Sequence, residues 1–451
     1  MRIAQVIPSL AVAAGPTTFC VKVADELAKT GCDVDLYASK LGNVCLRPQT
    51  PGVKVIAFGK ALHPVCVPDL IHVHALWGMA SHRGCTYARK NKIPYLVSAH
   101  GMLAPWALKH KWLKKKIAWR LYQKRDLEGA AMFHVTAECE IKWLRDLGFR
   151  QPCVLAPLGS DLPDLDFAES QRCQDVKSAL FLGRIYPVKG LMNLVRAWAR
   201  LKENVNHPSL NGTVKTVAGP GTDCGSRLSV NGTPWQLVIA GPDQAGHKAA
   251  LVAEAKRLGL RVEDTSVNAF MRSCVNMDGK VAENEVLGPS GPQSFFPDIF
   301  FTGSAYGEEK DALYRRADLF VLPSFTENFG VVVTDALAYR VPVITTKGTP
   351  WAELENCGNM FMRECVNGKT VPDENKAITQ CGNQTIPPVR AGWWIDIGVE
   401  PLATALKEAM SLSEENRLLM GSNGRQLVEM KYTWPAIAAE MKQTYTRILN
   451  H

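Results

Sequence analysis

Residues 318–339, D-L-F-V-L-P-S-F-T-E-N-F-G-V-V-V-T-D-A-L-A-Y, predict a strand, a tight turn and a helix in direct succession. The apolar run at 319–322 ends at Pro323, which is typical of a strand that is buried on both faces. Residues 327–330 form the turn, and the apolar residues from Val331 onward continue as a helix. Such a unit presents free backbone N–H groups and the positive end of a helix dipole, so it suits a phosphate.

Two acidic residues accompany this turn. Glu327 and Asp335 are eight residues apart, which places them about two helical turns from each other along one side. Carboxylates beside an anion site suit a ligand that carries both phosphates and hydroxyls, such as a nucleotide sugar. The alternative is an ordinary strand–helix unit with a solvated glutamate, and this stretch alone leaves both open.

Composition sets broad limits on the function. The 451 residues are enough for two or three domains, and 46% hydrophobic residues can form sizeable cores. The net charge of +9 permits an anionic ligand, nucleic acid or anionic lipid without selecting among them. The 13 cysteines show no C-x-x-C and no zinc spacing, which favours reduced thiols in a cytoplasmic protein.

The N-terminal residues admit two interpretations. An apolar run after Arg2 imitates a signal peptide, but Gln5, Pro8 and Ser9 interrupt it, so we favour a first buried strand. No stretch reaches the ~18 apolar residues of a membrane-spanning helix.

Strands alternate with helices along most of the chain, which predicts two parallel, doubly wound Rossmann-like sheets in tandem. We expect a first domain at 1–166, a linker at 167–177, a second domain at 178–433 and a final helix at 434–451 that returns to the first domain. Three Asn/Gly/Pro-rich stretches near 203–234, 261–297 and 358–389 lack a clear period and are interpreted as surface insertions.

A second candidate motif opens the second sheet, G-R-I-Y-P-V-K-G-L from Gly183 to Leu191. Gly183 lets another backbone approach closely, and Arg184 and Lys189 flank the turn into the next helix. Two cations there suit a diphosphate, although a basic loop of this kind is more often solvated. Because both motifs follow strands of one sheet, we expect them to meet where open α/β sheets bind ligands.

Together these motifs resemble the retaining glycosyltransferases of family 4, which have the two-domain GT-B fold. The resemblance also includes W-Q-L-V-I-A-G-P and V-P-V-I-T-T in the second half, and I-P-S-L…G-P, D-L-I-H-V-H-A-L-W, H-G-M-L-A-P-W-A-L, T-A-E and L-G-S-D in the first. It covers nearly the whole chain apart from the three insertions. The ordered set is specific, whereas each motif alone is weak.

The resemblance implies particular roles. Arg184 and Lys189 would bind the donor diphosphate, and Glu327 would contact sugar hydroxyls as a catalytic residue. The family has a glutamate on the nucleotide ribose eight residues after this one, where this chain has the shorter Asp335. The donor-binding positions implied are Arg184, Lys189, Asn328, Phe329, Gly330, Val331, Asp335 and Gly15.

Two further features concern cofactors and the first domain. The resemblance implies a metal-independent reaction without a protein nucleophile, so no cofactor is expected. The D-x-D sequences at 33–35 and 164–166 are weak metal candidates. His100 follows a strand of the first domain and matches a family histidine near the reacting sugar, where it would orient the sugar or the acceptor or act as a general base. A structural histidine is the alternative, and His74 is expected only to line the cleft.

Residues 109–125 hold eight Lys/Arg without an acid, interleaved with large apolar side chains. We expect one long basic helix at about 106–128. It suits an anionic membrane surface, or else it packs its aromatic residues on the sheet and solvates its basic face. Nucleic-acid binding is less favoured, because no nucleic-acid motif accompanies it.

The expected function is retaining transfer of a hexose from a nucleotide sugar to a glycan or lipid-linked glycan, in polysaccharide or lipopolysaccharide assembly at the inner face of the plasma membrane. A nucleotide-sugar epimerase of the same fold and a non-catalytic nucleotide-sugar-binding protein are the alternatives. A dinucleotide-dependent oxidoreductase is weakest, because the first turn lacks G-x-G-x-x-G.

Overall fold

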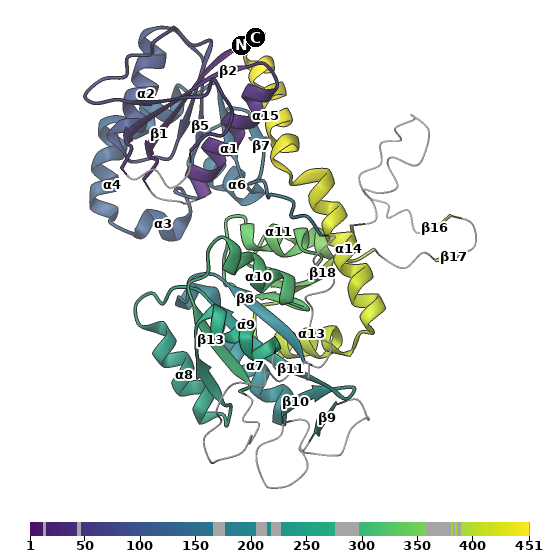
Figure 1. The fold of residues 1–451 in the computed structure, drawn as a ribbon. Helices are drawn as coiled ribbons and strands as arrows, with labels where there is room; N and C mark the ends of the chain where they lie inside the picture. Colours follow the sequence, from purple (N-terminus) through teal and green to yellow (C-terminus); the bar gives the residue numbers. More distant parts are fainter. Residues whose placement is uncertain are drawn as a thin grey trace. The chain divides into compact units, whose positions relative to one another are not determined.

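The computed structural model describes residues 1–11, 15–42, 47–165, 176–203, 214–217, 227–275, 297–357, 380–381, 384–385 and 389–450. The chain divides into two compact units (Figure 1). Unit 1 comprises Met1–Asp161 and Met430–His451, and unit 2 comprises Leu162–Glu429. The corresponding limits expected from the sequence are residues 166 and 434.

Unit 1 is built on a parallel sheet with the strand order β3-β2-β1-β4-β5-β6-β7. The central strands are apolar and buried on both faces, as a parallel sheet covered by helices requires. The order runs one way from β1 to β3 and the other way from β4 onward, so the chain reverses between β1 and β4. The strands are β1 (Arg2–Ser9), β2 (Asp33–Lys40), β3 (Lys54–Ala57), β4 (Leu70–His74), β5 (Tyr95–Ser98), β6 (Met132–Val135) and β7 (Cys153–Leu155).

Helices cover this sheet, and the last helix of the chain is one of them. In Figure 1, α15 (yellow) lies beside α1 (purple), and the two helices pack together. Ile437, Met441 and Tyr445 form the buried stripe of α15. The α-helices of unit 1 are α1 (Gly15–Lys29), α2 (Met79–Lys90), α3 (Pro105–Lys109), α4 (Trp112–Ala118), α5 (Lys124–Glu128), α6 (Glu138–Asp146) and α15 (Trp434–Leu449).

The expectation of one continuous basic helix at 106–128 is wrong, because the segment is broken into shorter helices. The segment forms α3, then α4, a π-helical turn η1 (Trp119–Gln123) and α5. The break falls at Lys111, whose φ of 52° lies in the left-handed region and cannot continue a right-handed helix. Composition alone predicts helix here, because none of these residues is a strong helix breaker.

Unit 2 repeats the architecture. Its main sheet has the order β12-β13-β11-β8-β14-β15-β18, and the pairs along it are parallel. β8 lies between β11 and β14, so the order of this sheet reverses at its first strand. The strands of this sheet are β8 (Lys177–Leu182), β11 (Thr233–Ala240), β12 (Val262–Asp264), β13 (Ile299–Gly303), β14 (Leu319–Leu322), β15 (Val343–Thr346) and β18 (Gly392–Ile395).

The helices of unit 2 follow the strands in alternation. Within the described residues, two α-helices come in succession at its end, and the 3₁₀ turns η3 (Pro187–Lys189) and η5 (Ala352–Glu355) lie in loops after strands of the sheet. The α-helices are α7 (Leu191–Glu203), α8 (His247–Arg257), α9 (Val267–Val275), α10 (Glu308–Arg316), α11 (Val331–Ala338), α13 (Val399–Ser411) and α14 (Glu414–Lys431).

The expectation of three surface insertions without regular structure is wrong in part, because some of their residues form strands and a helix. Within 203–234, β9 (Val214–Val217) and β10 (Arg227–Val230) extend the sheet as antiparallel strands beside β11. Within 261–297, β12 and α9 belong to the sheet and its cover, and the three residues of β12 are too few to show a period. Within 358–389, β16 (Gln380–Cys381) and β17 (Gln384–Thr385) form a small hairpin. The other residues of these stretches lie mostly outside the described ranges.

No helix in the described part of the chain is long and apolar enough to cross a bilayer.

Candidate functional site

The two motifs of unit 2 meet at the reversal point of its sheet. β8 and β14 are neighbouring parallel strands, with Leu319 paired to Ala179 and Phe320 to Leu180. The loops that follow these strands therefore leave the same edge of the sheet. This edge, beside a reversal of strand order, is where open α/β sheets bind ligands.

The two loops are in direct backbone contact. The amide of Phe325 donates to the carbonyl of Val188 at 2.8 Å. Gly190 has a φ of 68°, and a Cβ there would lie 2.0 Å from the carbonyl oxygen of Pro323. Only glycine fits such a position, because both the left-handed backbone and the close approach exclude a side chain. The second glycine of G-R-I-Y-P-V-K-G thus joins the two motifs.

Lys189 and Glu327 form an ion pair at this junction, and both side chains are largely buried. The hydroxyl of Ser324 donates to the same carboxylate oxygen, Oε1, at 2.6 Å. The backbone amide of Glu327 donates to the carbonyl of Gly348 at 2.9 Å, which holds the turn against the loop after β15. The glutamate is therefore fixed in place by contacts from three different loops.

The turn into α11 is similarly constrained. Gly330 precedes the helix with a φ of 84°, a conformation that favours glycine. The indole N–H of Trp351 donates to the carbonyl of Phe329 at 2.6 Å, and the two aromatic rings pack with centroids 5.0 Å apart. Asn328 lies between Glu327 and Phe329 in this turn. The N-terminus of α11, beginning at Val331, thus opens next to the Lys189–Glu327 pair.

The other two charged candidates have partners of their own. Arg184 is exposed and donates from Nη1 to Oε1 of Gln244 at 3.3 Å. Asp335 on α11 forms an ion pair with Lys310 of α10 at 2.8 Å. The structure therefore brings Lys189 and Glu327 together, and it places Arg184 and Asp335 in separate pairs within unit 2.

The first-unit candidates lie around the reversal between β1 and β4. Gly15 is the first residue of α1, and the Ala14 beside it lies outside the described residues. His100 follows β5 and is partly buried, with a φ of 48°. The amide of the next residue, Gly101, donates to Oε2 of the buried Glu140 on α6 at 2.9 Å. This contact fixes the backbone on which His100 stands.

Four histidines of unit 1 lie side by side. His72 and His74 of β4, His100 and His134 of β6 have ring centroids 4.1 to 6.0 Å apart for the pairs in contact. Burial, together with the neighbouring His134, lowers the pKa of His100 to about 3. Burial also lowers the pKa of His134 to about 4, and holds those of His72 and His74 well below the usual range. The cluster is thus uncharged at neutral pH.

Sequence reasoning did not find three residues that contact the candidates. Lys310 and Glu140 belong to mixed-charge helices and lie outside the motifs, and Gln5 is a single polar residue within an apolar strand. Gln5 in particular was used only as a break in the apolar run of the first strand. An unexpected polar residue at the centre of a buried strand is the signal that could have identified it.

The metal candidates are engaged in protein contacts. Asp33 lies 3.5 Å from the guanidinium of Arg2, and Asp35 accepts a hydrogen bond from Tyr37 at 3.3 Å. The second D-x-D sequence extends beyond the described residues at 166. Among the residues described, no group of three or more His, Cys, Asp or Glu side chains is arranged to hold a metal ion.

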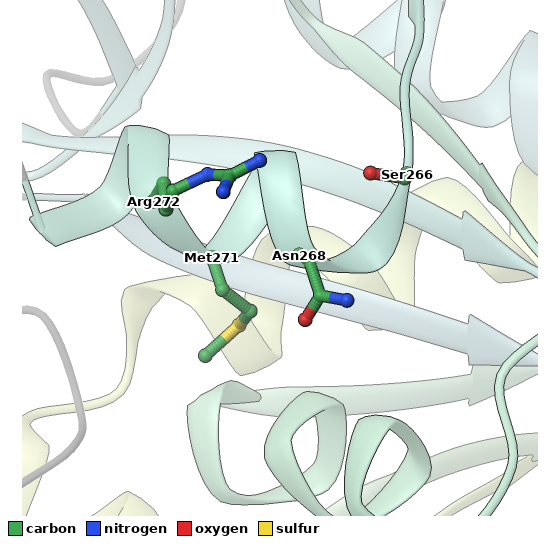
Figure 2. A pocket seen from close by; sticks show the side chains of 4 residues that line it. All are labelled: Ser266, Asn268, Met271 and Arg272. Atoms are coloured by element: carbon green, nitrogen blue, oxygen red, sulfur yellow. The ribbon is translucent and has the colours of Figure 1, made fainter.

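An open pocket of about 560 Å³ lies elsewhere on unit 2. Figure 2 shows its lining side chains, which come from α9 and the residue before it, and none is a candidate from the motifs. They are Ser266, Asn268, Met271 and Arg272.

Comparison with known proteins identifies two domains. Residues 67–159 match the family described as glycosyl transferase 4-like domain, and residues 297–370 match glycosyl transferases group 1. A curated relative, the D-inositol 3-phosphate glycosyltransferase of Corynebacterium jeikeium, is 23% identical over 296 residues. That alignment covers 62% of this chain and 56% of the relative. The chain thus matches little more than half the length of this relative.

Solved structures agree on the fold. HepE of Anabaena in complex with UDP-glucose aligns with 99% of this chain and 100% of its own, at a TM-score of 0.60 and 14% identity. WaaG, a glycosyltransferase involved in lipopolysaccharide biosynthesis, aligns over 99% of both chains at a TM-score of 0.55 and 13% identity. Two segments of the chain thus match glycosyltransferase family domains, and its two Rossmann-like units have the GT-B fold of these solved structures.

Proposed function

We propose that this protein transfers a hexose from a nucleotide-sugar donor to a glycan or lipid-linked glycan, with retention of the anomeric configuration. The observation that carries the proposal is the junction of Lys189, Glu327 and the N-terminus of α11 at the reversal point of the unit 2 sheet. The junction combines a cation, a carboxylate and a helix N-terminus. The UDP-glucose complex of HepE, a protein of the same fold, supports a nucleotide-sugar donor.

The junction can supply the chemistry that donor cleavage needs. Cleavage of the bond between the sugar and the diphosphate leaves negative charge on the departing phosphate oxygen. Lys189, Arg184 and the first turn of α11 are sources of positive potential on the same edge of the sheet, and preorganised groups stabilise such charge without rearrangement. Glu327 has a second carboxylate oxygen to accept hydrogen bonds from sugar hydroxyls. We assign no protein nucleophile.

Incubation of the purified protein with radiolabelled nucleotide sugars tests the proposal. UDP-glucose is the first donor to try, followed by other UDP-, GDP- and ADP-hexoses. Release of labelled hexose, or its transfer to a glycan in a membrane extract, is expected. Recovery of an isomerised nucleotide sugar would instead indicate an epimerase, and tight binding without any turnover would indicate a binding protein; either would overturn the proposal.

We further propose that unit 1 meets its acceptor at an anionic bilayer. Five large apolar residues of the α3–η1 segment are between 54% and 75% exposed, and exposed cations alternate with them. We call this set the basic apolar surface. It consists of Trp106, Trp112, Leu113, Ile117 and Leu121 with Lys109, Lys111, Lys114, Lys116 and Arg120.

This surface favours the membrane interpretation of the segment over a packed one. Only part of the segment packs inward: Trp119 contacts Phe149, and the hydroxyl of Tyr122 donates to the carbonyl of Trp77 at 2.8 Å. Within the described part of unit 1, the five apolar side chains of the basic apolar surface remain more than half exposed. A helix that binds at a bilayer surface has two features. Its apolar side chains insert into the bilayer, and its cations attract the lipid phosphates. The setting in lipopolysaccharide or other surface-polysaccharide assembly is supported by the involvement of WaaG, a protein of the same fold, in lipopolysaccharide biosynthesis.

A further inference from the structure

The four clustered histidines of unit 1 belong to two hydrogen-bond chains, and the direction of the first is fixed. The carbonyl of Ala156 can only accept, so His134 donates to it from Nε2 at 2.7 Å. Nδ1 of His134 then accepts from the hydroxyl of Ser98 at 2.7 Å. That hydroxyl oxygen accepts from Nε2 of His72 at 2.5 Å, and Nδ1 of His72 accepts from the hydroxyl of Tyr445 at 2.7 Å. Both neutral rings are therefore Nε2–H tautomers.

The second chain joins Gln5 of β1, His74 of β4 and the candidate His100. Nε2 of His74 lies 3.1 Å from Oε1 of Gln5, and Nδ1 of His74 lies 3.1 Å from Nε2 of His100. The two imidazoles are within 20° of parallel, with centroids 5.4 Å apart. The centroid distance exceeds the N···N distance by about the two ring radii, so the rings meet edge to edge. The contact is thus a linear hydrogen bond rather than stacking.

The amide oxygen of Gln5 sets the direction of this second chain. It can only accept, so His74 carries its proton on Nε2 and accepts at Nδ1. The proton between the two rings then belongs to Nε2 of His100. Nδ1 of His100 is left with its lone pair, and within the described chain it has no hydrogen-bond partner. His100 is partly exposed, whereas Gln5 and His74 are fully buried.

We propose that Gln5 and His74 are positioning residues that hold His100 as its Nε2–H tautomer, so that Nδ1 accepts a hydrogen bond from a substrate hydroxyl. The part of this inference that concerns substrate rests on the proposed glycosyl transfer. The backbone supports the same role, because His100 stands at a left-handed φ of 48° and Glu140 anchors the amide that follows it. The side chain is thus oriented at both its ring and its backbone.

This arrangement distinguishes between two roles of His100, which are orienting a substrate hydroxyl and acting as a general base. A general base must hold the proton that it abstracts, and the most effective pKa lies near the working pH. Burial among three other imidazoles lowers the pKa of His100 far below that range. A neutral ring with a fixed lone pair still accepts a hydrogen bond and orients a hydroxyl. His100 therefore positions substrate instead of removing its proton.

The first test uses the free protein, so that it does not depend on any activity. Protein labelled with ¹⁵N-histidine is examined by two-bond ¹H–¹⁵N correlation spectra, with His100→Gln to assign the His100 signals. We expect one neutral Nε2–H form of His100 from about pH 8 down to about pH 5. An Nδ1–H form, a mixture of forms or a titration near pH 6.5 would overturn the proposal. The opposite amide orientation of Gln5 would produce the first of these results.

Two matched variants of His74 test the positioning. The amide oxygen of His74→Asn can take the place of Nδ1 and accept from His100, whereas His74→Leu fills the space without an acceptor. The leucine variant should give a mixture of His100 tautomers, and the asparagine variant should keep the Nε2–H form. An unchanged His100 signal in the leucine variant would overturn the proposal. If that variant does not fold, Gln5→Met takes its place. It removes the acceptor at the end of the hydrogen-bond chain, so it should also give a mixture of His100 tautomers, and an unchanged signal would overturn the proposal.

The substrate contact has its own readout. With UDP-glucose as the donor, His74→Leu should lower kcat about tenfold with little change in KM, and His74→Asn should recover most of the loss. Equal kcat in the two variants would overturn the role of Nδ1. If no nucleotide sugar is turned over while the tautomer results are as expected, the glycosyl-transfer proposal and the hydroxyl contact fail, and the fixed tautomer stands.

Discussion

Lys189 and Glu327 were each predicted as site residues from their own motifs, and the two motifs were expected to meet. The ion pair between the two side chains was not predicted. Their ion pair joins positions 138 residues apart and depends on β8 and β14 being neighbours. Sequence patterns predict strands but not their order in a sheet. The pairing of Asp335 with Lys310 could not be predicted either, because sequence patterns do not show which residues of α10 and α11 lie opposite each other.

Loss of either cation should weaken donor binding. Arg184→Ala and Lys189→Ala each remove a cation that we propose contacts the diphosphate, and loss of such a charge-assisted contact costs about 1.5–3 kcal/mol. This corresponds to an increase of about 10- to 150-fold in the Kd for UDP-glucose, measurable by titration calorimetry. The control is Lys256→Ala, an exposed lysine on α8. Wild-type affinity in both test variants would refute their assignment to the donor site.

The two carboxylates should affect different kinetic constants. Glu327→Gln keeps the shape of a side chain held by Lys189 and Ser324 but removes its charge, so kcat should fall strongly. Asp335→Ala should chiefly raise the KM for the donor, because a ribose contact is remote from the bond that breaks and is nearly uniform between ground and transition states. Initial-rate kinetics with UDP-glucose separates the two cases. A large fall in kcat with unchanged KM for Asp335→Ala would contradict the division.

At the scale of elements, segments with a continuous apolar run or stripe were predicted better than broken helices and edge strands. The strand from Leu319 to Leu322 and the final helix were both recognised, because apolar runs and stripes reflect burial directly. The break at Lys111 was not, since a lysine carries no signal for a left-handed backbone. β12 was missed because it is an edge strand of three residues, held by its pairing with β13 rather than by its own pattern.

The basic apolar surface predicts salt-sensitive attachment to anionic vesicles. Each lysine near such a surface contributes about 1 kcal/mol, and the attraction is screened over about 8 Å at physiological ionic strength. Lys114→Glu/Lys116→Glu should abolish sedimentation with phosphatidylglycerol vesicles while UDP-glucose binding in unit 2 survives. Lys115 is left unchanged, because its ammonium donates to the carbonyl of Ala107 at 2.5 Å and lies over the ring of Trp77.

A charge-matched variant controls this experiment. Lys60→Glu/Lys90→Glu changes the net charge of unit 1 equally at exposed positions outside the surface. It should sediment like the wild type. If both double variants lose attachment to the same extent, the effect is one of total charge and the assignment of this surface is refuted.

At the scale of the whole molecule, the two units should differ in their response to acid. His72, His74, His100 and His134 have lowered pKa values when folded, so the unfolded chain binds more protons at low pH. Their contribution to stability is complete above about pH 6.5 and is lost as the pH falls toward the folded values. The loss is about 1.4 kcal/mol per histidine at pH 5.5.

Denaturant unfolding at a series of pH values measures this effect. Unit 1 should unfold at lower urea concentration at pH 5.5 than at pH 7.5. His134→Asn removes one of the four titrating groups, so it should reduce the slope of stability against pH even though it lowers stability at neutral pH. A slope that is the same in this variant and the wild type would show that the histidine cluster does not govern acid unfolding.

The return of α15 to unit 1 has a consequence for how the protein is made. Tyr445 completes the hydrogen bonds of His72, yet it is translated after the whole of unit 2. A ribosome must therefore add about 270 residues between the first part of unit 1 and the helix that covers it. During that interval the apolar face of α1 has no partner from α15, which makes the nascent first domain a substrate for chaperones. Unit 2 meets no such delay and can fold first, although it comes second in the sequence.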